Sequence, residues 1–296
     1  MKKEIRKKGF SLIELSVVIL IIGILIIGIS KGSRIIREAR LTSARTLTTN
    51  SPVASIPDLV AWYETILPSS FAAATRSDGH VMVLDPQTNA YWNDNSPHKN
   101  NNISNVNGLG VIFYSEYGIN NLPSLRISSL SYLNFNANSV IGKYYTVFIV
   151  EQRSVSGGIT MLGLGNHSTS YNTSTISNTA SGSVNVPAFS SSSLTPRIIT
   201  VLTAPQITVS KGVFVNGGGG LTYNTGSIAA NAGASGTPSF NGTMGGTIAA
   251  DSLNNSWYRG LMSEVIVYNR ALGINERNAI QDYLGKKYGI KVVTSI

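Results

Sequence analysis

A long apolar run, residues 12 to 29, follows a basic leader and contains one carboxylate, Glu14. The run is close to the ~20 residues that an α-helix needs to cross the hydrocarbon core of a bilayer. A carboxylate in hydrocarbon costs roughly 2.5–3.5 kcal/mol or more, so a simple anchor would not carry one. The run therefore predicts a transmembrane helix in which Glu14 has a partner.

Positive charge is concentrated around this run. Residues 1–45 contain ten Lys or Arg and three Asp or Glu, which is +7 of the chain's net charge of +9. This placement is typical of segments that follow the positive-inside rule and lie beside anionic lipid. We therefore expect no nucleic-acid binding by the nearly neutral remainder. A removable secretory signal fits poorly, because no small-residue cleavage site follows the run.

The junction between leader and run resembles the processing signal of type IV pilins and type II secretion pseudopilins. The matching string is Lys8-Gly9-Phe10-Ser11-Leu12-Ile13-Glu14. The resemblance implies that a prepilin peptidase cuts between Gly9 and Phe10, that the leader 1–9 is removed and that Phe10 is N-methylated. In a bundle of such helices, Glu14 of one subunit can offset the Phe10 ammonium of its neighbour and so fix the axial register.

The helix is expected to extend beyond the apolar run, as a transmembrane and stem helix over residues 10–50. An imperfect apolar stripe continues in the stem at Ile35, Ile36, Ala39 and Leu47. Pro52 and Pro57 cannot continue a helix and mark its end. Many major pilins carry a helix-bending proline near the position of Lys31; this chain has none there, which argues against a major pilin.

Residues 51–296 are predicted to form a head of strands separated by Ser, Asn, Gly and Thr. The clearest predicted strands are 81–84, 144–150, 197–202, 209–215 and 262–268. Many strands without alternating helices favour an antiparallel β-sandwich. With the N-terminal helix, this predicts an α+β chain.

A short helix is predicted near the end of the chain. Gly273 lies at its N-cap, Ile274 opens it, and Glu276 stands three residues after the cap. Lys286 and Lys287 occupy its last turn, and Gly289 follows the end. Its apolar face consists of Ile280, Tyr283, Leu284 and Tyr288.

Residues 259–290 resemble the closing segment of concanavalin A-like lectin or laminin-G-like domains. The matching residues are Gly260, Glu264, Val265, Tyr268, Asn269, Arg270 and Lys286 to Gly289. Residues 56–64 resemble that domain's first strand, and residues 144–166 resemble its central pair of strands. The resemblance implies a concanavalin A-like jelly roll over residues 51–296.

Glycoside hydrolysis needs two carboxylates flanking the scissile bond. The Glu-x-Asp-x-x-Glu string of glucanase relatives is missing, and Glu264 is the one acid in the strongest strand. We expect Glu264 to be a structural carboxylate, bonded within the sheet or paired with Arg259 or Arg270. The chain is accordingly predicted not to be an enzyme.

The sequence contains no clear motif for a metal or a cofactor. His80, His98 and His167 lack ligand spacing, and the chain has no cysteine. No cofactor is expected. Calcium is the one candidate, because relatives use loop oxygens for it, and the acids in predicted loops are Asp78, Asp85, Asp94 and Asp251.

Saccharide binding needs exposed aromatic rings and amides, and two strings have that composition, residues 89–102 and 254–258. Their aromatic residues are Tyr91, Trp92, Trp257 and Tyr258. Burial of the same rings in the core is the competing interpretation.

The sequence favours a minor type IV pilin-like subunit that assembles through its N-terminal helix and displays a lectin-like head for adhesion to a glycan or a surface protein. Before assembly it would lie in the bacterial inner membrane with a periplasmic head, and afterwards in a pilus or on the cell surface. One alternative is a pseudopilin-like structural component of a secretion or DNA-uptake system. The other is an envelope-tethered enzyme that cleaves glycans.

Overall fold

The computed structural model describes residues 11–71, 82–83, 91–99, 103–104, 112–128, 131, 133–136, 145–154, 160–164, 174–177, 195–203, 211–217, 222–224, 245–248 and 258–292. The chain divides into two compact units, Met1–Ser43 and Ala44–Ile296. We call the second unit the head, and each unit is described by itself.

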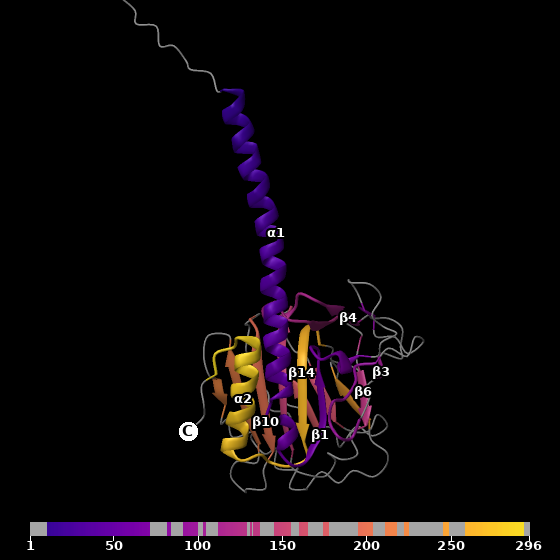
Figure 1. The fold of residues 1–296 in the computed structure, drawn as a ribbon. Helices are drawn as coiled ribbons and strands as arrows, with labels where there is room; N and C mark the ends of the chain where they lie inside the picture. Colours follow the sequence, from indigo (N-terminus) through magenta and orange to yellow (C-terminus); the bar gives the residue numbers. More distant parts are fainter. Residues whose placement is uncertain are drawn as a thin grey trace, which may run out of the picture. The chain divides into compact units, whose positions relative to one another are not determined.

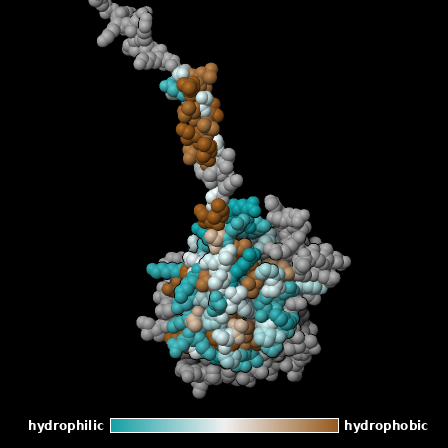
Figure 2. Space-filling model, in the orientation of Figure 1, coloured by the Kyte–Doolittle hydropathy of each residue, from teal (hydrophilic) through white to brown (hydrophobic). Residues whose placement is uncertain are grey.

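One helix, α1, covers Leu12–Thr49, and the prolines that follow it begin at Pro52. Its large apolar side chains lie on its surface, and Figure 2 shows them gathered along the helix. Leu12 is 87% exposed and Ile26 is 59% exposed. Among the helices in the described part of the chain, none combines the length and the hydropathy that a membrane crossing requires. The transmembrane interpretation of residues 12–29 therefore stays a prediction.

The head consists of strands, one longer helix and short 3₁₀ turns (Figure 1). The strands are β1 (Leu59–Glu64), β2 (Met82–Val83), β3 (Ile103–Ser104), β4 (Ile112–Ser115), β5 (Ser124–Ile127), β6 (Leu133–Asn136), β7 (Thr146–Arg153), β8 (Thr160–Leu164), β9 (Ser174–Ser177), β10 (Arg197–Thr203), β11 (Lys211–Gly217), β12 (Thr222–Asn224), β13 (Gly245–Ile248) and β14 (Gly260–Tyr268). The helices are η1 (Val53–Ser55), η2 (Pro68–Ser70), η5 (Ile119–Asn121) and α2 (Ile274–Tyr288).

The described strands form two antiparallel sheets. The larger has nine strands in the order β12-β11-β10-β7-β14-β5-β4-β2, with β1 also paired to β14. The smaller has five strands in the order β3-β6-β13-β8-β9. The mixed helix and antiparallel-sheet class was thus predicted correctly. The predicted central pair of strands, β7 and β8, was wrong as a pair, because the two strands lie in different sheets.

Strand β14 holds the large sheet together. Along one edge it pairs with β7 from Gly260 to Tyr268. The other edge is shared, because β5 pairs with Gly260–Met262 and β1 pairs with Glu264–Tyr268. The register shifts between Met262 and Glu264, which leaves Ser263 at a bulge where the edge passes from β5 to β1.

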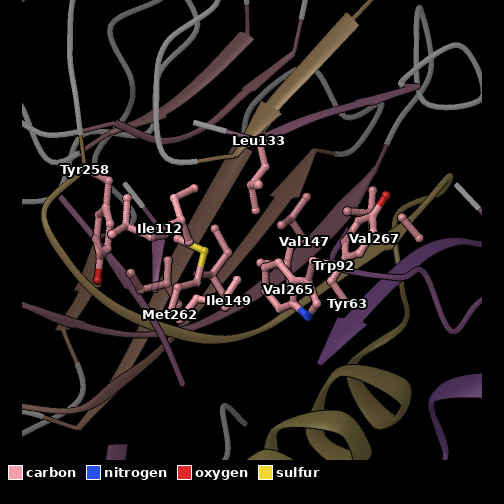
Figure 3. Packing of buried hydrophobic residues seen from close by; sticks show 14 of the residues in the cluster. Tyr63, Trp92, Ile112, Leu133, Val147, Ile149, Tyr258, Met262, Val265 and Val267 are labelled. Carbon is pink, nitrogen blue, oxygen red and sulfur yellow. The ribbon is translucent and has the colours of Figure 1, made fainter. Parts of the chain in front are cut away.

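The core lies on one face of the large sheet, and alternate residues of each strand point into it (Figure 3). From β14 these are Met262, Val265 and Val267, and from β7 they are Val147 and Ile149. Leu133 of β6 belongs to the same cluster, so the small sheet covers this face. Successive strand residues point to opposite faces, so Glu264 and Tyr268 of β14 lie on the other face, toward α2.

Helix α2 begins and ends as predicted. Gly273 is its N-cap, and Glu276 Oε2 accepts a hydrogen bond from the Gly273 N–H at 2.8 Å. Gly289 ends the helix in a left-handed conformation with φ of 63°, which glycine adopts without steric cost. Hydrogen bonds join Gln281 to Thr200 of β10 and Lys287 to Glu264 of β14, and these contacts hold α2 against the large sheet (Figure 1).

Replacing Glu276 with glutamine is expected to lower the free energy of unfolding by about 1 kcal/mol at neutral pH. Arg270 donates two hydrogen bonds to this carboxylate, at 2.8 and 2.6 Å, and they lower the pKa of Glu276 from 4.5 to about 2. A lowered folded-state pKa contributes stability that is present above the unfolded-state pKa and is lost as pH falls through the folded-state pKa. Urea unfolding should show the wild-type advantage shrinking from pH 4.5 toward about pH 2. The exposed change Asp282→Asn on the same helix is the control, and a pH-independent Glu276→Gln difference would contradict the assignment.

Candidate functional site

The first candidate site is the start of α1. Glu14 Oε2 accepts a hydrogen bond from the Ser11 N–H at 2.9 Å. Glu14 is exposed, and its carboxylate satisfies one of the backbone donors that a helix leaves open at its first turn. Gly9 and Phe10, the predicted cleavage and methylation positions, lie outside the described residues. The assembly role of Glu14 stays a prediction.

The residues after Glu14 present an apolar surface to the outside of the helix. The exposed large side chains of this segment are Leu12, Ile13, Leu15, Val17, Val18, Ile19, Leu20, Ile21, Ile22, Ile24, Leu25 and Ile26. Exposed apolar area of this extent is characteristic of a surface that associates with another apolar surface. This segment of α1 is therefore a candidate surface for association with another apolar surface.

The predicted saccharide-binding aromatics are corrected by the structure. The Trp92 and Tyr258 side chains are fully buried in the core cluster, and neither ring is available for stacking (Figure 3). Each polar atom is used inside, since Trp92 Nε1 donates to the Glu64 carbonyl at 2.6 Å and Tyr258 Oη donates to Glu151 at 3.0 Å. Tyr91 is half-buried, and Trp257 lies outside the described residues.

A buried charged cluster lies between the large sheet and α2. Glu64 of β1 and Glu264 of β14 are directly opposite each other, and both are completely buried. Like charges at opposed strand positions repel. Lys287 of α2 relieves this repulsion, because its Nζ lies 2.8 Å from Glu264 Oε2 and 3.4 Å from Glu64 Oε2. We call these three residues the buried triad.

Neutral donors complete the buried triad. Glu264 accepts hydrogen bonds from Trp62 Nε1 at 2.8 Å, Tyr283 Oη at 2.9 Å and Tyr288 Oη at 3.0 Å. Burial raises the pKa of Tyr283 and Tyr288 well above the usual value, so both hydroxyls stay protonated as donors. Glu264 is thus a structural carboxylate bonded within the sheet, to Trp62 of β1, which confirms one of the two predicted alternatives. The other alternative, pairing with Arg259 or Arg270, is wrong, because Arg270 pairs with Asp58 and Glu276.

The Glu64 carboxylate is held by backbone groups as well as by Lys287. It accepts hydrogen bonds from the Ile66 N–H at 2.7 Å and the Leu67 N–H at 2.8 Å, together with the Ser70 hydroxyl. Glycoside hydrolysis requires two carboxylates that flank a substrate bond, so the Glu64 and Glu264 pair has to be considered for that role. This pair is covered by α2 and saturated with donors, so it cannot meet a substrate in this conformation.

A second buried ionic group lies on the core side of the same sheet. Glu151 and Arg153 come from β7 and Arg197 from β10, and all three are at most 2% exposed. Arg197 Nη2 lies 3.0 Å and Arg153 Nε 3.8 Å from Glu151 Oε1. Burial raises the pKa of Glu151, and the two guanidinium groups oppose that rise. This group ties β7 to β10 at one end of the core.

Of the four aspartates predicted as calcium candidates, the structure describes only Asp94. Asp94 is buried, with Oδ1 accepting from the Trp62 and Ser96 N–H groups and Oδ2 from the Ser96 hydroxyl. Its oxygens are therefore engaged by protein donors. Asp78, Asp85 and Asp251 lie outside the described residues. Where side chains are described, no cluster of three or more metal-ligating residues occurs.

Comparison with known proteins gives a sequence match at the start of the chain and a fold similarity to solved structures. Residues 5–30 match the family described as the prokaryotic N-terminal methylation motif. No curated protein matches the chain. The match supports a prepilin-type processing signal at the start of the chain and does not extend to the head.

Solved structures resemble the head in fold. A GH54 α-L-arabinofuranosidase soaked with a cyclic sulfate inhibitor has 11% identity and a TM-score of 0.53, over 79% of this chain and 64% of that chain. Domain 4 of AbnA, a GH43 arabinanase from Geobacillus stearothermophilus, has 11% identity and a TM-score of 0.41 over 69% and 99%. Trypanosoma rangeli sialidase has 13% identity and a TM-score of 0.40 over 79% and 34%. The chain spans less than two thirds of the arabinofuranosidase, and the last two similarities are too weak to bear on function.

The prediction that the chain is not an enzyme is corrected by this comparison. The arabinofuranosidase, a glycoside hydrolase, shares the fold at a TM-score of 0.53, so the fold gives no ground for excluding an enzyme. At these identities the likeness concerns the fold alone. The predicted concanavalin A-like lectin family is likewise replaced by the broader statement that the head is a β-sandwich of the kind found in glycoside hydrolases.

Proposed function

We propose that this protein is a minor type IV pilin-like subunit whose N-terminal helix packs among similar helices and whose head binds carbohydrate at the cell surface. The observation that carries the proposal is the match of residues 5–30 to the methylation motif. The exposed apolar face of α1 supports it, because a helix of this kind needs partners to cover that face.

The route to the surface follows from the same motif. A prepilin peptidase would remove residues 1–9 at the inner membrane, with the head on the periplasmic side, and leave Phe10 as a methylated N-terminus. Glu14 then has a second possible partner besides the Ser11 N–H, namely the Phe10 ammonium of a neighbouring subunit. A charge pair of this kind inside a packed bundle fixes register, since a shifted neighbour would leave both charges unpaired.

The size of the head supports a minor rather than a major subunit, since a unit spanning Ala44–Ile296 would crowd a filament if it occurred at every position. Carbohydrate is the favoured ligand class because the head shares its fold with an arabinofuranosidase. A surface protein is the alternative ligand.

The proposal is tested by replacing Glu14 with valine. The variant should still be processed, because the change lies outside the bond that is cut, but it should be at least tenfold depleted in sheared filaments, because the charge pair that sets register is lost. Mass spectrometry should find a methylated Phe10 start in both proteins.

Ser16→Ala, an equally exposed change on α1, is the matched control and should assemble normally. An intact Met1 start in cells that contain the peptidase would sink the processing step. Wild-type yield of Glu14→Val in filaments would remove the role given to Glu14.

A further inference from the structure

The buried triad holds an amine against a carboxylate where water does not reach. Lys287 Nζ lies 2.8 Å from Glu264 Oε2, and neither side chain has any exposed area. Two groups held in contact react far faster than the same groups free in solution, because folding has already removed the freedom that their encounter would cost. The absence of water also protects the product of such a reaction from hydrolysis.

The hydrogen-bond donors around Glu264 are distributed as an attack on its carboxyl carbon requires. Oε1 accepts from Trp62 Nε1 at 2.8 Å and from Tyr283 Oη at 2.9 Å. When an amine adds to a carboxyl carbon, negative charge develops on the oxygen that stays, and fixed donors stabilise it. Oε2, which lies beside the lysine, accepts from Tyr288 Oη at 3.0 Å and is the oxygen that would leave.

Glu64 is placed to carry protons between these groups. Its Oε2 lies 3.4 Å from Lys287 Nζ, and its side chain is also fully buried. The Ile66 and Leu67 N–H groups hold this carboxylate in position. A carboxylate in contact with an ammonium can accept its proton and free the electron pair that an amine needs for attack. The nearer carboxylate, Glu264, is therefore the group attacked, and Glu64 is the base.

We propose that Lys287 and Glu264 become joined by an amide bond between their side chains. Glu64 passes one proton from the Lys287 ammonium to Glu264 Oε2, and the freed amine forms a bond to Glu264 Cδ. Glu64 then passes a second proton from Nζ to Oε2, and the Cδ–Oε2 bond breaks as water leaves. One ammonium and one carboxylate give one amide and one water, Glu64 is regenerated, and the reaction consumes no oxidant or cofactor.

The bond would fasten the last helix of the head to its central strand. Lys287 of α2 follows Glu264 of β14 by 23 residues, so the link closes a loop and restricts the unfolded chain as a disulfide does. The chain contains no cysteine and so has no disulfide to serve this purpose. The inference is independent of the ligand proposed for the head.

Tryptic peptides of the full chain, purified in a mild detergent and then denatured, test the bond. Trypsin cuts after Lys and Arg, so an unlinked chain gives residues 260–270 as a separate peptide and is cut after Lys287. We expect residues 260–270 joined to residues 287–291, uncut at Lys287, with a mass one water below the sum of the two peptides. Fragmentation of this branched peptide should place the link on Glu264.

Three variants accompany the wild type. Lys287→Arg removes the amine and should abolish the link. Glu64→Gln removes the base and should lower the linked fraction of freshly purified protein at least tenfold, and thermal unfolding checks that this variant is folded. Lys286→Met changes the exposed neighbour and is the control, in which the intact mass should still be one water below that of the unlinked chain.

Two results would overturn the inference. If folded wild-type protein releases residues 260–270 only as a free peptide, the buried triad is an ion pair only. If residues 287–291 are joined instead to residues 46–76, the peptide that contains Glu64, the assignment of the two carboxylates is wrong.

Discussion

Replacing Lys287 with methionine should lower the free energy of unfolding by about 3–5 kcal/mol, because the change leaves two buried carboxylates facing each other without a cation. Methionine keeps most of the length of the lysine side chain, so the lost packing is small. The Lys287 ammonium lies within 3.4 Å of both Glu64 and Glu264, and water does not reach any of the three side chains. Urea unfolding of wild type and variant measures the loss.

Lys286 provides the matched control for this prediction. It is the preceding residue of the same helix turn, but it is exposed. Lys286→Met should change stability by no more than about 0.5 kcal/mol. Adding Glu264→Gln to the Lys287→Met variant removes one of the two opposed charges and should recover part of the loss, because residues in one ionic network are coupled. Equal effects of Lys286→Met and Lys287→Met would show that the buried triad does not stabilise the fold.

Replacing Gly260 with alanine should also be strongly destabilising, by about 3 kcal/mol or more. Gly260 has a φ of 154°, and a Cβ there would lie 2.4 Å from the Gln152 carbonyl oxygen. The obstruction is backbone of β7, the strand to which β14 is paired, so the clash cannot be relieved by turning a side chain. The melting temperature and the urea midpoint of the variant should both fall.

Gly273→Ala serves as the comparison for Gly260→Ala. A Cβ at Gly273 would lie 3.5 Å from Glu276 Oε2, which is ordinary contact, and its φ is −63°. The cost there should not exceed about 1 kcal/mol, the difference between glycine and alanine at an N-cap. Similar losses at the two positions would refute the steric argument for Gly260.

Local signals were predictable from the sequence, and α2 shows why. Gly273, Glu276 and Gly289 each act on backbone within a few residues, so their spacing alone predicts where the helix begins and ends. The longest strands of the large sheet, β7, β10, β11 and β14, were also recognised because they are long and apolar, whereas the short strands β4, β5 and β12 were not. The assignment of β7 to the large sheet and of β8 to the small sheet was not predicted. The two strands adjoin in the sequence, and only long-range packing separates them.

The buried triad was not predicted because it too depends on long-range packing. Lys286 and Lys287 are identical in sequence terms, and only the rotation of the helix against the sheet buries one of them. Its partner Glu64 is 223 residues away along the chain. Trp92 and Tyr258 were misassigned because they stand in polar strings, where composition suggests exposure.

The position of β14 has a consequence for how the protein is made. This strand pairs with β1, β5 and β7, and it comes after all three in the sequence. More than a hundred residues separate it from β7, and still more separate it from β1 and β5. A ribosome releases the chain from its N-terminus, so the earlier strands must wait for their shared partner with their edges open. The head can therefore close only after residue 268 has been synthesised.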